Sequence, residues 1–242
     1  MKIILSFILA LFINTLCSGQ YVHELSTERE AYIIGSGLLG LGVSFALNKD
    51  LKPLTEEEIE RLNPLNINGL DRVATATFSK NARNWSDGFL YGSIGAAPLA
   101  LLLDKESRAD YGDISAMYFE TMLINNSLTA LSKTFFRRTR PYAYNDDVDL
   151  TLKLGKSTRF SFFSGHTSNV AAASFFSAKV YSDNNPGSKM KNVYWGTAAI
   201  IPAIQGYLRV KGGKHFPTDV IVGYVVGALA GILVPELHRV DP

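Results

Sequence analysis

Three short clusters of cationic, hydroxyl and imidazole side chains contain the residues of this sequence that are best suited to chemistry. The first includes Lys133 and Arg140, seven positions apart and followed by Pro141. Seven residues make nearly two helical turns, so both cations would face the same side, and Pro141 would stop or redirect the chain. Taken alone, this cluster, which also contains Arg137 and Arg138, is more typical of a basic patch that faces solvent or lipid headgroups.

The second cluster is Ser164, Gly165 and His166, directly before an apolar segment at 167–180. If that segment is a helix, its first N–H groups and its dipole would favour an anion. Gly165 would let the backbone approach closely. The three residues could therefore cradle a phosphate, although Ser-Gly-His alone is also a common turn and cap.

The third cluster contains Arg209, His215 and Asp219. The carboxylate lies four positions after the imidazole, where it can accept a hydrogen bond from one ring nitrogen and leave the other free to act. A surface His–Asp pair at a capped helix remains the alternative. Two of the four histidines of the chain thus lie in these clusters; the four are His23, His166, His215 and His238.

Six apolar segments separate and flank these clusters. Their length and their Leu, Ala and Ile content favour helices over strands, and we predict an all-α bundle of about six main helices. The segments span 31–47, 88–103, 114–132, 167–180, 192–208 and 220–235. The three clusters fall at successive helix ends, which a bundle could bring together. In the polar connection at 48–87, Thr55 and Glu58 form a capping-box pattern that predicts a short helix.

Composition narrows the class of protein. The chain has 242 residues, of which 47% are hydrophobic and 19% charged, and its net charge is +2. This length is typical of one domain, and the abundant apolar residues exclude a disordered chain. The weak positive charge argues against nucleic acid as a partner. Cys17 is the only cysteine, so neither a disulfide framework nor a thiolate metal site is expected.

The sequence leaves membrane embedding open. A membrane span needs about 20 apolar residues, and the six segments are at or below that length. Glu120 lies inside the third segment, where a carboxylate would be costly in lipid. A membrane-embedded bundle and a compact soluble domain with apolar helices are therefore both retained.

The first residues have the pattern of a secretory signal peptide. Lys2 precedes an apolar stretch at 3–16, and small residues follow at 17–19. We predict a signal peptide at 1–19 and export to the cell envelope; an uncleaved anchor helix is the alternative. Residues 20–87 would then form an N-terminal helix and a polar connection, and residues 88–242 a catalytic core on which the helix at 31–47 packs.

The three clusters together resemble the motifs of the type 2 phosphatidic acid phosphatase and vanadium haloperoxidase superfamily. The patterns K-x6-R-P, S-G-H and R-x5-H-x3-D occur here in the order of that family, within about residues 88–235. Two positions depart from the family pattern. Phe163 stands where proline usually precedes Ser-Gly-His, and Leu208 stands where serine usually precedes the arginine of the third motif.

The resemblance implies a role for each matching residue. His215 would attack phosphorus and form a phosphohistidine, with Asp219 orienting its ring. His166 would protonate the leaving oxygen and then activate water. The remaining residues would bind the phosphate, so that no metal or other cofactor is needed for the reaction; they are Lys133, Arg140, Ser164, Gly165 and Arg209.

The function that the resemblance implies is a phosphatase acting on a phosphomonoester or diphosphate, with a lipid phosphate of the cell envelope as the preferred substrate. A soluble periplasmic acid phosphatase acting on small phosphate esters is the main alternative. A vanadate-dependent haloperoxidase is disfavoured by the short chain, and a non-catalytic membrane protein by the intact His166, His215 and Asp219.

Overall fold

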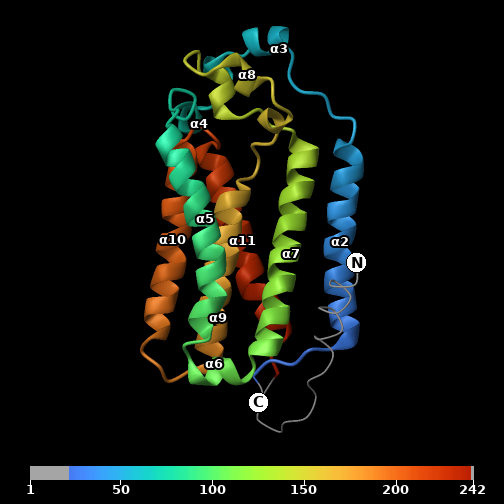
Figure 1. Ribbon diagram of the computed structural model, residues 1–242, viewed down its shortest axis with the longest axis vertical. Coiled ribbons are helices and arrows are strands. Elements are labelled where there is room, and N and C mark those ends of the chain that lie inside the picture. Colours follow the sequence, from blue (N-terminus) through green and yellow to red (C-terminus); the bar gives the residue numbers. More distant parts are fainter. Residues whose placement is uncertain (1–21, 241–242) are drawn as a thin grey trace.

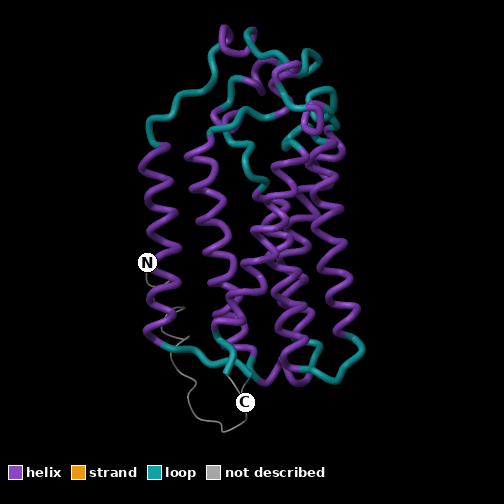
Figure 2. Tube along the Cα trace, turned by 180° about the vertical axis from the view of Figure 1, so that it is seen from behind, coloured by secondary structure: helices purple, strands orange, loops and turns teal. Residues whose placement is uncertain are grey.

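Six long helices lie side by side in the computed structural model, which describes residues 22–240 (Figures 1 and 2). They are α2 (Thr27–Asn48), α5 (Lys80–Leu101), α7 (Tyr111–Phe136), α9 (Gly165–Asn184), α10 (Lys191–Lys211) and α11 (Pro217–Leu237). Within the described range the only β-type pairing is an isolated bridge between His23 and Arg239. The predicted all-α bundle of about six main helices is confirmed, whereas the predicted signal peptide at 1–19 lies outside the described residues.

Short helices occupy the connections. Most lie at the end of the bundle drawn uppermost in Figure 1: α3 (Glu56–Glu60), η1 (Pro64–Asn66), α4 (Gly69–Arg72), η2 (Pro141–Tyr144), α8 (Leu150–Lys153) and η3 (Lys156–Arg159). The helix α6 (Lys105–Ala109) lies at the opposite end. The predicted capping box of α3 is present, because Glu58 N–H donates to Thr55 Oγ1 (3.2 Å) and Thr55 N–H donates to Glu58 Oε2 (2.8 Å).

Helix α5 begins earlier than the apolar pattern predicts. The apolar segment starts at residue 88, but the helix starts at Lys80, where Ser79 Oγ accepts a hydrogen bond from Ala82 N–H (3.2 Å). The first two turns of α5 are polar, so hydrophobicity does not reveal them. As a result Ser86 and Asp87, which the sequence assigns to the polar connection, lie on a helix of the bundle.

Helix α9 lies at the centre of the bundle and packs against α5, α7, α10 and α11. Its residues are buried on nearly every side, as expected of a core helix. Helix α2 packs along α7 at the edge of the bundle. A hydrophobic cluster fills the space between α5, α7 and α9; its buried members are Leu101, Ile114, Met117, Phe176, Val180 and Tyr181.

Glycines bring α11 very close to α9. Gly223, Gly227 and Gly231 recur every four residues and therefore lie on one face of α11. A Cβ atom at Gly227 would lie 2.1 Å from Ser168 O, and one at Gly231 would lie 2.5 Å from Ala172 O. Small residues of this kind allow backbones to approach, and this approach fixes α11 against the start of α9.

Two asparagines of α7, Asn125 and Asn126, pair with Asn169 of α9. Asn125 Nδ2 donates to Asn169 Oδ1 (2.6 Å), and Asn169 Nδ2 donates to Asn126 Oδ1 (3.1 Å). These bonds join α7 to α9 and satisfy amide groups that would otherwise be buried without partners.

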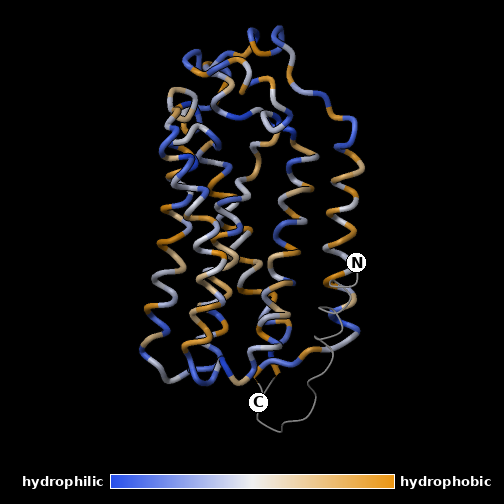
Figure 3. The backbone as a smooth tube through the Cα atoms, viewed as in Figure 1, coloured by the Kyte–Doolittle hydropathy of each residue, from blue (hydrophilic) through white to orange (hydrophobic). Residues whose placement is uncertain are grey.

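The outer surface of the bundle is apolar. Along α11, the face opposite the glycines presents a row of exposed aliphatic side chains: Ile221, Val225, Leu229, Leu233 and Leu237. Exposed apolar residues also lie on α2, including Leu39 and Phe45. Figure 3 shows apolar residues spread along the helices. Within residues 22–240, two helices, α2 and α11, have the length and apolar composition needed to cross a membrane.

Candidate active site

The three sequence clusters meet at one end of the bundle. The C-terminal end of α7, the N-terminal end of α9 and the α10–α11 connection all lie toward the end drawn uppermost in Figure 1. Backbone contacts join them directly. Ser164 N–H donates to Asp219 O (3.0 Å), which links the second cluster to the third.

Gly165 brings the first cluster against the second. A Cβ atom at this position would lie 3.1 Å from Lys133 Nζ and 2.9 Å from Thr129 Cγ2. Glycine therefore leaves room for the Lys133 ammonium beside the first turn of α9. Lys133 and the N-terminus of α9 consequently face the same point.

His215 is buried in this region as a neutral ring. Its Nδ1 lies 2.7 Å from Ser161 O. Because a carbonyl only accepts, Nδ1 carries the proton and Nε2 keeps its lone pair. Burial, and then the charges of Arg140 and Arg209, hold the pKa of His215 well below its ordinary value of 6.5. The ring is therefore in the form that can act as a nucleophile or base.

Asp219 does not hold the His215 ring directly. The sequence suggests a hydrogen bond between them, but Asp219 Oδ2 lies 3.7 Å from His215 Nδ1. The carboxylate is instead occupied by Ser161 Oγ (2.5 Å) and Phe216 N–H (2.9 Å), which both donate to Oδ2. Asp219 thus fixes Ser161, whose carbonyl in turn fixes the ring.

Arg138 neutralises Asp219. Its guanidinium donates to Asp219 Oδ1 (2.5 Å) and to Asp71 Oδ2 (2.8 Å), and it stacks over the Phe216 ring at 4.1 Å. Thr218 completes this network by donating from N–H (2.9 Å) and Oγ1 (2.7 Å) to Asp71. The sequence shows Arg138 only as a member of a basic patch, because Asp71 lies far away in the chain.

His166 is paired with a residue that the sequence analysis missed. Its Nε2 lies 2.9 Å from Asp87 Oδ1, and the same oxygen accepts from Arg209 Nη1 (3.1 Å). Arg209 Nη1 also donates to Ser86 Oγ (2.8 Å). Since a carboxylate only accepts, His166 Nε2 carries a proton. The N-terminal turns of α5 thus contact both His166, the predicted general acid, and Arg209, a predicted phosphate-binding residue.

The cations in this region lack sufficient acceptors. Among the residues at 22–240, no acceptor receives a hydrogen bond from Lys133 Nζ or from the Arg140 guanidinium, and the buried Nε atoms of Arg140 and Arg209 have no partner. A buried donor without an acceptor costs about 1–3 kcal/mol. Arginine and lysine donors around one space match the several oxygens of a phosphate group.

Two further cations lie beside this set. The pKa of Lys214 is lowered to about 7 by burial and by the charges of Arg140 and Arg83. Lys214 Nζ lies 4.8 Å from the centre of the Tyr142 ring, which holds the ammonium against the same connection. Neither Lys214 nor Arg83 belongs to the motif pattern, so only the fold shows that they add positive charge here.

Ser164 has a structural task in the described conformation. It is fully buried and caps α9, accepting from Thr167 N–H at 3.4 Å and lying 2.9 Å from Thr167 Oγ1. By contrast, the N–H groups of Gly165 and His166 meet no acceptor within the described part of the chain. These two N–H groups, rather than the Ser164 hydroxyl, are available to an anion at the helix end.

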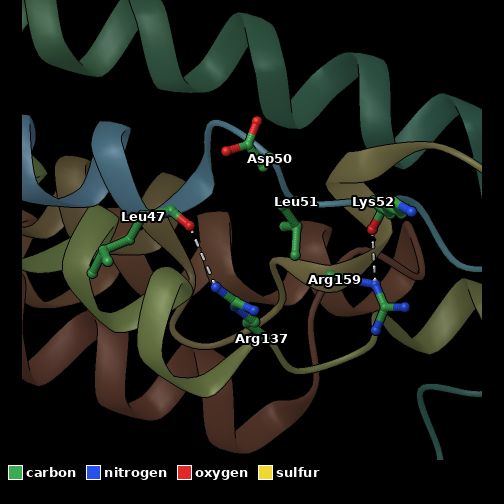
Figure 4. Close-up of a pocket in the computed structure, with 6 residues that line it drawn as sticks. All are labelled: Leu47, Asp50, Leu51, Lys52, Arg137 and Arg159. Atoms are coloured by element: carbon green, nitrogen blue, oxygen red, sulfur yellow. Dashed lines mark hydrogen bonds between the residues drawn. The ribbon is translucent and has the colours of Figure 1, made fainter.

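A separate cavity of about 460 Å³ lies near the end of α2 (Figure 4). Its lining residues are Leu47, Asp50, Leu51, Lys52, Arg137 and Arg159. Here Arg137 Nη2 donates to Leu47 O (3.4 Å) and Arg159 Nε donates to Lys52 O (3.2 Å). These arginines hold the chain that leaves α2, and neither histidine of the candidate site lines this cavity.

Comparisons with known proteins agree with this site. The family described as PAP2 superfamily matches residues 115–240, more than half of the 242 residues, and this range contains all three clusters. The chain is also similar to the lipid A 4'-phosphatase of Porphyromonas gingivalis, with 26% identity over 184 residues, which cover 75% of this chain and 73% of the relative. No solved structure gives a significant match.

The family match and the convergence of its motif residues at one end of the bundle have the same explanation. A phosphoryl group is stabilised mainly by positioned cations and hydrogen-bond donors, which this end of the bundle supplies. The chain belongs to the PAP2 superfamily and is a phosphoric ester hydrolase.

Proposed function

We propose that this enzyme removes a phosphate group from a membrane lipid through a phosphohistidine intermediate. The observation that supports the proposal most strongly is the neutral, buried His215 beside cations that have unpaired donors. The lipid part of the proposal rests on the apolar exterior of the bundle and on the similarity to a lipid A 4'-phosphatase.

In the proposed binding step, the phosphate oxygens accept hydrogen bonds from Lys133, Arg140 and Arg209. The N–H groups of Gly165 and His166 complete the set of donors at the start of α9. Arg209 is already held by Ser86, so its guanidinium is positioned before substrate arrives. Such preorganised donors favour the transition state because they need little rearrangement during the reaction.

In the first chemical step, the lone pair of His215 Nε2 forms a bond to phosphorus while the bond from phosphorus to the leaving oxygen breaks. His166, which carries a proton on both ring nitrogens in this step, gives one of them to that oxygen and becomes a neutral ring. In the second step, His166 takes a proton from water, the water oxygen attacks phosphorus, and the bond to Nε2 breaks. Inorganic phosphate is released and both rings return to their starting state.

Several side chains act by positioning the reactive groups. Ser161 O fixes the proton on His215 Nδ1, Asp219 fixes Ser161, and Arg138 fixes Asp219. Asp87 holds His166 and Arg209 through one oxygen. We propose that Asp87 gives up Arg209 when substrate binds, since the phosphate then supplies the competing oxygens.

The apolar helices are proposed to place this enzyme in a membrane of the cell envelope, with residues 1–19 directing export. Exposed aliphatic rows such as that on α11 would face lipid, where their apolar surface is removed from water and no polar group is buried. A lipid substrate would then reach the site from the same membrane. In the proposed organisation, the helix at the N-terminal edge supports a catalytic core that contains α5 to α11.

Replacing the proposed nucleophile tests the reaction and the substrate class together. We expect His215→Ala to lower phosphate release from a lipid phosphate monoester in mixed micelles by at least about 1,000-fold, since no other group can form the intermediate. Thermal unfolding would show that the variant remains folded. Near-normal turnover by the variant would contradict the assignment. A wild-type enzyme that prefers a soluble ester such as p-nitrophenyl phosphate would favour the periplasmic acid phosphatase alternative.

Arg138 and its neighbour Arg137 form a matched pair of tests. We expect Arg138→Gln to lower kcat by about 10- to 100-fold with a smaller change in KM, because it removes the cation that positions Asp219. Arg137→Gln removes the same charge from a side chain bonded to Leu47 O and should change kcat less than about threefold. Equal effects of the two substitutions would mean that Arg138 contributes only general charge. Arg138→Lys keeps the charge but not the two-acceptor geometry, and should restore little activity.

Lys214 should make anion binding sensitive to pH. Its lowered pKa of about 7 means that Lys214 is cationic below pH 7 and neutral above it. Competitive inhibition by sulfate, whose charge is constant in this range, should therefore weaken by up to about tenfold between pH 6 and pH 8. Lys214→Gln should bind sulfate more weakly at pH 6 and show a flatter profile. A profile identical to that of the wild type would place Lys214 outside the anion site.

A further inference from the structure

A second cluster of ionisable side chains lies away from the candidate active site. Glu30 of α2, Glu120 of α7 and His238 just after α11 each contribute one atom to a group whose members lie within 4.8 Å of one another. His238 Nε2 lies 3.0 Å from Glu30 Oε2 and 3.0 Å from Glu120 Oε2. Glu120 precedes Lys133 by thirteen residues on α7, a rise of about 20 Å.

Two of the three side chains in this cluster are buried. Glu120 is 1% exposed and His238 is fully buried. The side chains come from α2, from α7 and from the residue that follows α11, which are distant in sequence, so the cluster forms only in the folded bundle. The first turns of α2 and the C-terminal end of α11 lie together at the lower end of the bundle in Figure 1.

The His238 ring is oriented so that Nε2 faces the two carboxylates. Its Nδ1 lies 2.7 Å from Val234 O, and since a carbonyl only accepts, Nδ1 carries a proton. A hydrogen bond from the other ring nitrogen to a backbone carbonyl is the usual second contact of a histidine that ligates a metal. Nε2 therefore has either a lone pair for a ligand or a second proton.

A proton on Nε2 does not satisfy the cluster. One N–H group points at one acceptor, and its hydrogen bond goes to Glu30 Oε2 (3.0 Å). Within the described chain, Glu120 Oε2 is buried with no hydrogen-bond donor, although it faces the same nitrogen. Leaving a charged oxygen buried and unpaired is costly. A proton shared between Glu30 and Glu120 would pair this oxygen, whereas a bound cation would pair it and contact Glu30 and His238 Nε2 at the same time.

We propose that Glu30, Glu120 and His238 bind a divalent transition-metal ion, with Zn²⁺ as the best fit. One imidazole nitrogen and two carboxylate oxygens are ligands that zinc accepts, and water would complete a tetrahedral set. The ion would satisfy Glu120 Oε2 and take the place of any proton on Nε2, which would be released to solvent. Its role would be to join α2 to α7 and α11, and the hydrolytic reaction would not use it.

Charged side chains next to this cluster do not occupy the oxygen atoms that face His238 Nε2. Arg29 Nη2 lies 3.3 Å from Glu30 Oε1, the oxygen that does not face His238, and Asp113 lies close enough to raise the local negative charge. His23 also faces this region but is paired with Asp183 at 3.3 Å. The ligand oxygens of Glu30 and Glu120 therefore remain directed at Nε2.

Zinc titration of the full-length protein in detergent, after removal of metals with a chelator, tests the proposal. We expect one Zn²⁺ per chain at the cluster, a rise in Tm on binding, and release of about one proton per ion, seen by calorimetry in two buffers of different ionisation enthalpy. Glu120→Gln and His238→Gln should each weaken this binding by at least about tenfold and remove the rise in Tm. Glu28→Gln is the control, because Glu28 lies on α2 like Glu30 but outside the cluster, and this variant should bind zinc as the wild type does.

Histidines of the candidate active site provide the competing explanation for zinc binding. His166→Ala and His215→Ala should retain the high-affinity ion, and loss of binding in these variants would overturn the proposal. Wild-type protein that binds no zinc, or Glu120→Gln and His238→Gln proteins that bind it normally, would also overturn it. If the cluster variants do not fold, X-ray absorption of zinc-loaded His166→Ala/His215→Ala protein decides, because the proposal requires one imidazole among oxygen ligands.

Discussion

The structure depends on a local excess of positive charge that the protein itself neutralises only in part, through Asp87. Lys133, Arg140 and Arg209 belong to two of the three sequence clusters, and all three lie near enough to His215 for their charges to lower its pKa. Like charges repel, and buried donors without acceptors are costly, so this arrangement persists only because the rest of the bundle enforces it. A bound phosphate group would remove both costs, since it supplies hydrogen-bond acceptors and negative charge together.

The carboxylates near the site are arranged so that they do not cancel this charge. Asp219 and Asp71 share Arg138, and Asp219 also accepts from Ser161 and Phe216. Within residues 22–240, Lys133 and Arg140 are therefore left without a carboxylate partner, while Arg209 is paired with Asp87. Close packing of α11 on α9 at Gly223 and Gly227 keeps Asp219 and the first turn of α9 in register. The Asp219 carboxylate therefore contacts the His215 region through backbone and hydroxyl groups and does not touch the imidazole ring itself.

Much of the fold, and the convergence of the three clusters at one end of the bundle, could be predicted from the sequence, because apolar segments mark helices and the clusters lie at helix ends. Other features depend on tertiary contacts that leave no local pattern. The acceptor for His215 is the carbonyl of a residue 54 positions away, and every residue has a carbonyl. Asp87 lies in polar turns of α5 that resemble a loop, and Arg138 is distinguished from Arg137 only by the position of Asp71. The separate cluster of Glu30, Glu120 and His238 likewise leaves no local sequence pattern, since its members lie far apart in the chain.

The most direct test of the account is to isolate the intermediate. Enzyme mixed with a ³²P-labelled lipid phosphate monoester and quenched in alkali, which preserves phosphohistidine, should contain label on the peptide that includes His215. The label should be acid-labile and absent from His215→Ala protein. Rapid turnover with no label on His215, or with label on another residue, would contradict the proposed role of the neutral imidazole.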